Sequence, residues 1–209
     1  MGELSSVAIG SSAELPQTIT VAIIGAGPLG RRLALRSAQA GYRVVLEDVM
    51  PANLRHAEET LRNTLGDALR GPNSQSLVTF ARTLEEAVRE ADLVIDCVPD
   101  ELESKLEIFS LLDRMAPPRT VFATPTRHLS IADLASCTYR PDRCVSMAVD
   151  AGQFDEGSGG EFLPLSNRCI PVCITGKTSA EARELVTGFW IRLGYEPVVE
   201  ADTAEALLL

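Results

Sequence analysis

A glycine-rich turn between an apolar run and an amphipathic stretch constrains this chain more than any other feature. The run Val21–Ile24 leads directly into the segment Gly25–Gly30, which has the pattern Gly-x-Gly-x-x-Gly. An amphipathic stretch follows, and then a second apolar run, Val44–Leu46, ends at the acids Glu47 and Asp48. The order strand, glycine turn, helix, strand, acid is the context that a dinucleotide-binding turn requires.

Each residue of the turn has a distinct physical role in such a site. Gly25 permits the tight turn, Gly27 lets the backbone approach a pyrophosphate, and Gly30 lets the helix pack closely on the strand. Pro28 and Leu29 open the helix, whose free N–H groups and positive dipole end favour a phosphate. Pro28 is tolerated in this first turn because its missing N–H would have no partner within the helix.

The acid at the end of the second run predicts which dinucleotide binds. Asp48 lies 23 residues after Gly25, where a carboxylate accepts hydrogen bonds from ribose hydroxyls and repels a 2′-phosphate. The residues that follow, Val49, Met50 and Pro51, include no arginine. The sequence therefore predicts NAD rather than NADP, and the competing interpretation is a plain glycine turn between a strand and a helix.

Strand and helix patterns alternate along the chain. Strands are expected near 18–24, 43–47, 76–81, 91–99, 120–123, 144–149, 170–175 and 196–200, and helices near 29–39, 52–69, 84–90, 101–115, 131–135 and 180–193. This alternation predicts an α/β fold: a doubly wound, mostly parallel Rossmann-type sheet with helices on both faces.

The domain organisation follows from composition. Residues 1–17 are Ser-rich and are expected to form a flexible lead-in, and residues 18–209 a single NAD-binding domain. A polar, glycine-rich loop is expected at about 150–168. Ser130 is an expected N-cap, as is either Thr178 or Ser179.

Charge and cysteine content exclude several classes of function. The net charge of −10 disfavours binding to nucleic acids and to anionic membranes, and no apolar run is long enough to span a membrane. The start of the chain lacks the basic and apolar segments of a signal peptide.

Five cysteines, mostly within apolar strand patterns, indicate buried reduced thiols in a cytoplasmic protein. Two histidines and these cysteines do not form a metal-ligand pattern, so no metal site is predicted.

Five stretches together resemble the NAD-binding domain of 3-hydroxyacyl-CoA dehydrogenases. They are residues 25–30, 40–48, 91–100 with Lys105, 129–135 followed by 140–143, and 194–199. The resemblance implies that Asp100 and Lys105 border the nicotinamide half of the cofactor, and that Val98 and Pro99 belong to the same cofactor-binding loop. For Lys105, a solvated helix residue paired with Glu101 or Glu103 is the alternative.

The residues that carry out the family's chemistry are replaced. Members of the family oxidise a 3-hydroxyl group with a His general base that a Glu orients. Here Ala148 takes the His position and Val172 the Glu position, and Ala151 replaces an Asn. In the substrate-binding segment, Pro125 replaces Asn and Arg127 replaces Ser. The chain also stops where the family's C-terminal helical domain would begin.

The sequence thus leaves three functions open. The first is an NAD-binding protein without the family's activity: a pseudo-dehydrogenase that serves as a sensor or a partner subunit. The second is an NAD-dependent oxidoreductase with a rebuilt site at Arg127, His128 and Asp150, acting on a 3-hydroxyacyl thioester or a small hydroxy acid. The third is a structural protein that binds no nucleotide. His128 is equally compatible with a surface loop, and Leu207–Leu209 with a contact to a protein partner.

Overall fold

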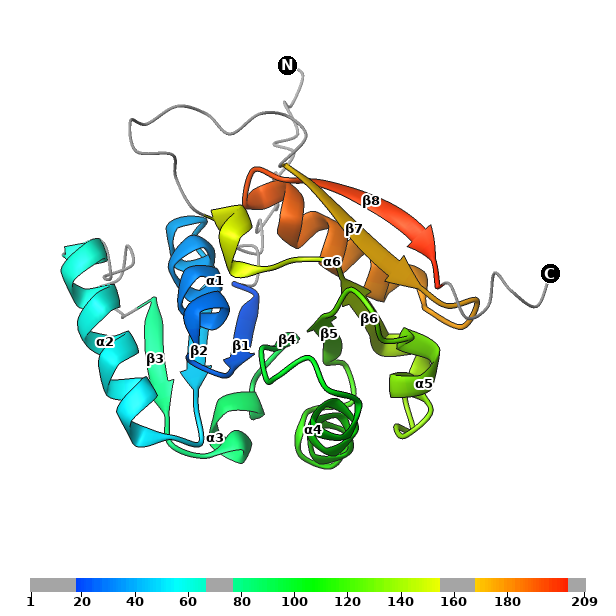
Figure 1. The fold of residues 1–209 in the computed structure, drawn as a ribbon, viewed down its shortest axis with the longest axis horizontal. Coiled ribbons are helices and arrows are strands. Elements are labelled where there is room, and N and C mark those ends of the chain that lie inside the picture. Colours follow the sequence, from blue (N-terminus) through cyan, green and yellow to red (C-terminus); the bar gives the residue numbers. More distant parts are fainter. Residues whose placement is uncertain (1–17, 67–76, 155–167, 203–209) are drawn as a thin grey trace, which may run out of the picture.

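The computed structural model describes residues 18–66, 77–154 and 168–202 (Figure 1). The expected lead-in at 1–17, most of the expected glycine-rich loop and the C-terminal leucines lie outside the described residues. The domain boundary at residue 18 therefore stays a prediction.

The described residues contain one eight-stranded sheet with the strand order β3-β2-β1-β4-β5-β6-β7-β8. The strands are β1 (Thr20–Ile24), β2 (Arg43–Glu47), β3 (Val78–Ala81), β4 (Leu93–Asp96), β5 (Val121–Pro125), β6 (Cys144–Met147), β7 (Cys169–Ile174) and β8 (Glu196–Ala201). Neighbouring strands are parallel except β6 and β7, which are antiparallel. The predicted α/β, doubly wound, mostly parallel sheet is confirmed.

Helices cover both faces of the sheet (Figure 1). On one face lie α1 (Pro28–Gln39), α2 (Pro51–Leu65) and α6 (Ala180–Arg192). On the other face lie α3 (Leu84–Val88), α4 (Leu102–Met115) and α5 (Ile131–Ala135). Each set buries a separate apolar core against the sheet, so the strands are covered on both sides, as parallel strands require.

The apolar core beneath α1, α2 and α6 extends into the segment expected to be a polar loop. Residues Ala151–Phe154 form a short 3-10 helix, η3, and a second one, η2, spans Pro141–Arg143. The Phe154 ring is buried and lies 6.4 Å from the Trp190 ring and 5.6 Å from the Tyr195 ring, centroid to centroid. The first residues of the expected loop thus form a short 3-10 helix, and the Phe154 side chain anchors them to the core.

Local capping explains where several helices begin and end. The hydroxyls of Ser130 and Ser179 accept from the N–H groups of Asp133 and Ala182, both at 3.2 Å, which confirms both as N-caps. α2 ends at Leu65, and Gly66 has φ +48°. The rest of the helix predicted for 52–69 lies outside the described residues.

Close contact between α1 and the glycine turn fixes the helix on the sheet. A Cβ atom at Gly30 would lie 1.8 Å from the carbonyl oxygen of Gly25. Any side chain at position 30 therefore forces α1 away from the turn. The prediction that Gly30 serves close packing is confirmed.

In the parts of the chain that the structure describes, no helix has both the length and the apolar character needed to cross a membrane.

Replacement of Gly30 by Ala is expected to destabilise the fold. Because the backbone must shift to accommodate the methyl group, we expect the free energy of unfolding to fall by on the order of 1–3 kcal/mol. Gly188 in α6 is a matched control, since a Cβ atom there meets nothing within 4 Å. Gly188→Ala is expected to raise the free energy of unfolding by roughly 0.5–1 kcal/mol. Urea unfolding followed by circular dichroism measures both, and a Gly30→Ala variant as stable as the wild type would contradict the role of this contact.

Candidate dinucleotide-binding site

A cleft of about 910 Å³ lies at the carboxyl ends of β1, β2 and β4. This edge lies where the strand order reverses, between β1 and β4, and such a switch point is where open α/β sheets bind ligands. The volume is within the range of about 300–1,000 Å³ typical of ligand sites. Of the predicted site residues, five line the cleft: Gly25, Gly27, Asp48, Val98 and Pro99.

The glycine turn has the geometry that a pyrophosphate needs. Gly25 has φ +104°, and a Cβ atom there would lie 2.9 Å from the carbonyl oxygen of Cys97. A Cβ atom at Gly27 would meet nothing within 4 Å, so the backbone is open on this side. α1 begins at Pro28, so the N–H groups of Leu29 and Gly30 belong to its first turn and have no partner within the helix. These residues fit the phosphates of a dinucleotide.

The Asp48 carboxylate holds the turn as well as lining the cleft. It accepts from the backbone N–H groups of Ala26 and Met50, each at 2.7 Å, and from the side-chain amide of Asn53 at 3.3 Å. The Asn53 amide contacts both carboxylate oxygens at 3.3 Å, so these contacts use the roughly four acceptor sites that a carboxylate offers. A ribose hydroxyl at Asp48 would therefore take the place of the long Asn53 contacts. Asn53 was missed by sequence reasoning, although an amide in the first turn after an acid is a recognisable signal.

Lys105 lies beneath the cleft rather than in its wall. The side chain is fully buried, and its Nζ donates to Asp96 Oδ2 at 3.2 Å and to Thr124 Oγ1 at 2.9 Å. Asp96 Oδ1 accepts from the N–H of Val98 at 3.0 Å. The buried pair therefore supports the loop that carries Val98 and Pro99.

Two expectations for Lys105 and Asp100 are affected by this arrangement. The alternative of a solvated Lys105 paired with Glu101 or Glu103 is wrong, because α4 turns this side chain into the core toward Asp96. Asp100 is exposed, and neither it nor Lys105 is among the described residues that line the cleft. Direct contact of either residue with the cofactor stays a prediction.

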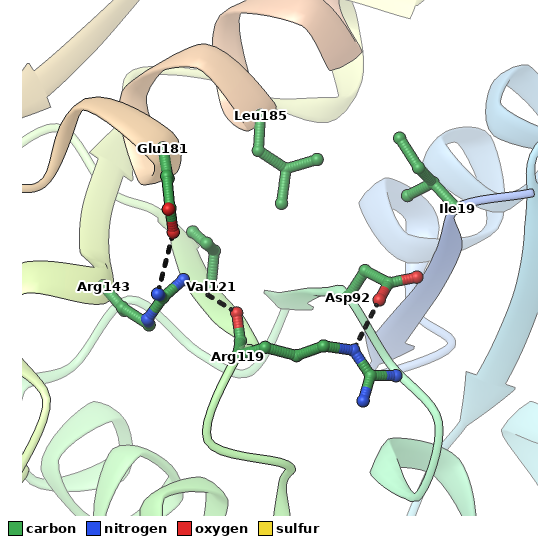
Figure 2. A pocket seen from close by; sticks show the side chains of 7 residues that line it. All are labelled: Ile19, Asp92, Arg119, Val121, Arg143, Glu181 and Leu185. Carbon is green, nitrogen blue, oxygen red and sulfur yellow. Dashed lines mark hydrogen bonds and ion pairs between the residues drawn. The ribbon is translucent and has the colours of Figure 1, made fainter. Parts of the chain in front are cut away.

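A smaller hollow of about 280 Å³ lies at the opposite edge of the sheet, where the strands begin (Figure 2). Its charged residues are paired with one another: Arg119 with Asp92, and Arg143 with Glu181, each at 2.9 Å. Arg143 also donates to the carbonyl oxygen of Arg119 at 3.0 Å. These interactions tie α6 to the start of β5 and β6, and they indicate a structural role.

Comparison with known proteins agrees with the geometry of the cleft. Residues 20–148 match the family model of the 3-hydroxyacyl-CoA dehydrogenase NAD-binding domain. The chain belongs to the 3-hydroxyacyl-CoA dehydrogenase family. Its matched part is the family's NAD-binding domain, and NAD is the cofactor that this domain binds.

Individual relatives support the same assignment. The chain is 34% identical over 135 residues to the probable 3-hydroxybutyryl-CoA dehydrogenase of Bacillus subtilis, covering 61% of this chain and 47% of the relative. It is 29% identical over 197 residues to the mitochondrial hydroxyacyl-coenzyme A dehydrogenase of Homo sapiens, covering 88% of this chain and 59% of the relative. The chain thus spans about half the length of these relatives.

A solved structure shows the same fold. The crystal structure of (S)-3-hydroxybutyryl-CoA dehydrogenase from Ralstonia eutropha superposes with a TM-score of 0.73, covering 90% of this chain and 65% of that chain at 21% identity.

A second hollow, of about 430 Å³, lies beside Ala148, the position that the resemblance implies for the family's histidine. Ala148 lines it together with Arg127 and Asp150. Arg127 Nη2 and Asp150 Oδ2 form an ion pair at 2.9 Å. Among the rebuilt-site candidates, the fold thus brings Arg127 and Asp150 together. The side chain of His128 is exposed, and this residue does not belong to the described lining of the hollow.

The cleft also contains residues to which the sequence reasoning gave no role. They come from β2, from the segment after β3 and from α4, and they include Glu47, Arg82, Leu84, Glu107 and Ile108. These three segments are far apart in sequence, so only the fold shows that they line the same cleft. Glu47 did carry a signal, since an acid at the end of a buried apolar strand is unusual.

The cysteines differ in part from the expectation of buried thiols. All five are free, but only Cys144 is fully buried. Burial raises the pKa of Cys144 to about 12. The other four are partly exposed. Cys169 and Cys173 lie on β7 near the edge of the sheet, Cys97 borders the cleft, and Cys137 follows α5.

Replacement of Lys105 by Met is expected to destabilise the protein strongly. Removing one partner leaves the buried Asp96 without its counter-charge, which typically costs about 3–5 kcal/mol. Burial already raises the pKa of Asp96, and the Lys105 ammonium group opposes that rise. In the variant, the pKa of Asp96 in the folded state lies above its value in the unfolded state. Between these two pKa values the folded state binds more protons, so the free energy of unfolding falls as the pH rises.

Urea unfolding at about pH 5 and about pH 8 tests this expectation. Lys105→Met should lose more stability at the higher pH. The double variant Asp96→Asn/Lys105→Met removes both charges and should recover part of the loss, with a flat pH dependence. A single variant with wild-type stability at both pH values would rule out a supporting role for the pair.

Proposed function

We propose that this chain binds NAD without performing the family's proton transfer, and that it serves as an NAD sensor or as a cofactor-binding partner subunit. The observation that carries the proposal is the contrast between two parts of the molecule. The cofactor cleft keeps its glycine turn and its acid, whereas Ala148 and Val172 stand where the family has its His and Glu.

The β6–β7 pairing supports the loss of proton transfer. Val172 lies opposite Met147 in the antiparallel register, and the Ala148 N–H donates to the carbonyl oxygen of Pro171 at 3.0 Å. Positions 148 and 172 are therefore held close together by main-chain pairing, as a base and its orienting residue need to be. A methyl group and an isopropyl group cannot accept a proton. Loss of a general base typically lowers a rate by about 100- to 10,000-fold.

A rebuilt oxidoreductase site is the second candidate. The hollow beside Ala148 places the Arg127 guanidinium group next to the Asp150 carboxylate. An acidic substrate would compete with Asp150 for Arg127 and release Asp150 to act as a base. A 3-hydroxyacyl thioester or a small hydroxy acid fits this proposal. Cytoplasmic location and a protein partner stay predictions in both cases.

NADH is expected to bind saturably and NADPH much more weakly. The Asp48 carboxylate repels a 2′-phosphate, so we expect a difference in Kd on the order of tenfold or more. Nicotinamide fluorescence during titration measures both constants. Asp48→Asn removes the charge and should narrow the difference. Equal affinity for the two dinucleotides would contradict the assignment of Asp48, and no binding of either would overturn the proposed function.

Turnover separates the two candidates. With NADH and 3-oxobutyryl-CoA, the sensor proposal predicts no enzyme-dependent loss of NADH absorbance, because no general acid–base pair remains at positions 148 and 172. Turnover that is lost in both His128→Ala and Asp150→Asn would establish the rebuilt site instead. A Leu129→Ala variant with retained turnover would serve as the control for a general disturbance of that loop.

A further inference from the structure

Glu47 is an acid that the fold buries at the edge of the cofactor cleft without giving it a partner. It is the last residue of β2 and is only 6% exposed. Its backbone carbonyl accepts from the Gly25 N–H at 2.8 Å. Its carboxyl group forms no hydrogen bond or ion pair with any residue that the structure describes. Among the described residues, Ser37 Oγ is the fully buried side-chain polar atom without a partner, so the Glu47 carboxyl oxygens are open to the cleft they line. An acid that is largely buried, lacks a protein partner and faces a cleft is a candidate ligand-binding group.

The surroundings of Glu47 indicate what that ligand is. Strand alternation separates Glu47 from Leu46, whose side chain lies in the core beneath α1 and α2. Glu47 lines the cleft on the other face, together with the apolar side chains of Leu84, Ile108 and Leu111. This wall adjoins Asp48, the expected ribose ligand. A base attached to a ribose at Asp48 would meet this apolar wall, with the Glu47 carboxyl group beside it.

Other charged and titratable groups also face this part of the cleft. They are Asp48 on β2, Arg82 after β3, Cys97 after β4 and Glu107 on α4. Arg82 forms no ion pair with Glu47. Burial and, to a lesser extent, the Asp48 carboxylate raise the pKa of Glu47 to about 7. Near neutral pH, a large fraction of this group is therefore the uncharged carboxylic acid.

An uncharged carboxylic acid is complementary to an edge of adenine. It presents an O–H donor beside a carbonyl acceptor, and the N7 edge of adenine presents the N7 acceptor beside the N6 amino donor. At that same edge hypoxanthine presents only acceptors, N7 and its carbonyl oxygen. A glutamine amide offers the same pair and is a standard partner of adenine. We propose that the Glu47 carboxyl group, which lines the cleft beside Asp48, recognises the adenine of the bound dinucleotide through this pair of hydrogen bonds.

The inference rests on the proposed binding of NAD and adds two properties to it. The first is selectivity for adenine over a base that lacks the N6 amino group. The second is a decrease in affinity as the pH rises through about 7, because the carboxylate loses the O–H donor and places a negative charge beside an anionic ligand.

Titration of the full chain with NADH and with reduced nicotinamide hypoxanthine dinucleotide tests the selectivity. The hypoxanthine base carries a carbonyl oxygen where adenine has its amino group. At about pH 6, we expect the wild type to bind NADH on the order of tenfold more tightly. Glu47→Gln should keep this preference, since its amide reproduces the donor and acceptor of the neutral acid. Glu47→Met, which has neither, should lose it.

Titration with NADH at about pH 6 and about pH 8.5 tests the pH dependence. The wild type is expected to lose affinity on the order of tenfold at the higher pH, whereas Glu47→Gln and Glu47→Met should change little. Because the wild type and the two variants differ only at position 47, a pH dependence that disappears in both variants is assigned to Glu47. Circular dichroism checks that each variant is folded. If Glu47→Gln does not fold, the Glu47→Met variant and the comparison of the two dinucleotides in the wild type still test whether Glu47 recognises adenine.

The outcomes distinguish this inference from the function on which it depends. Equal binding of the two dinucleotides by the wild type, or a pH dependence that persists in both variants, would overturn the role of Glu47 and leave NAD binding intact. No binding of NADH by the wild type at either pH would overturn the proposed function and this inference together.

Discussion

The close contact between Gly30 and the carbonyl oxygen of Gly25 is the constraint on which the rest of the site depends. It brings the first turn of α1 directly onto the end of β1, and it directs the helix N-terminus toward the open backbone at Gly27. The turn is held from two sides, because Gly25 donates to the Glu47 carbonyl and Ala26 donates to the Asp48 carboxylate. One steric requirement thus sets the position of the phosphate-binding groups and of the ribose-binding acid.

The floor of the cleft is polar although its side chains are buried. Lys105, Asp96 and Thr124 form a fully buried network beneath the loop after β4. Such a network is only tolerable because its members satisfy one another. Glu47 differs from them in having no protein partner among the described residues. We therefore interpret the network as a structural support for the loop and Glu47 as a group that faces the ligand.

The two halves of the site depend on different parts of the fold. The cofactor half is built from β1, α1 and β2, which are consecutive in the chain, and it retains every residue type that a dinucleotide needs. The half around Ala148 depends on the antiparallel pairing of β6 with β7. That pairing keeps its geometry while the side chains at positions 148 and 172 are aliphatic. In the proposed function the scaffold binds a cofactor without the family's acid–base chemistry, which is consistent because binding and proton transfer use different residues.

The sequence by itself determined the sheet, most helix positions and the cofactor, because the glycine turn, the apolar strands and the capping serines are local signals. It did not determine that Lys105 is buried against Asp96, that Arg127 pairs with Asp150, or that Phe154 anchors its segment to Trp190. Each of these contacts joins residues separated in the chain, so only tertiary packing decides which partner is within reach. Glu47 illustrates the division most clearly. The sequence shows an acid at the end of an apolar strand, but whether that acid is solvated, paired or left facing a cleft is set by the burial that α3, α4 and β3 impose around it.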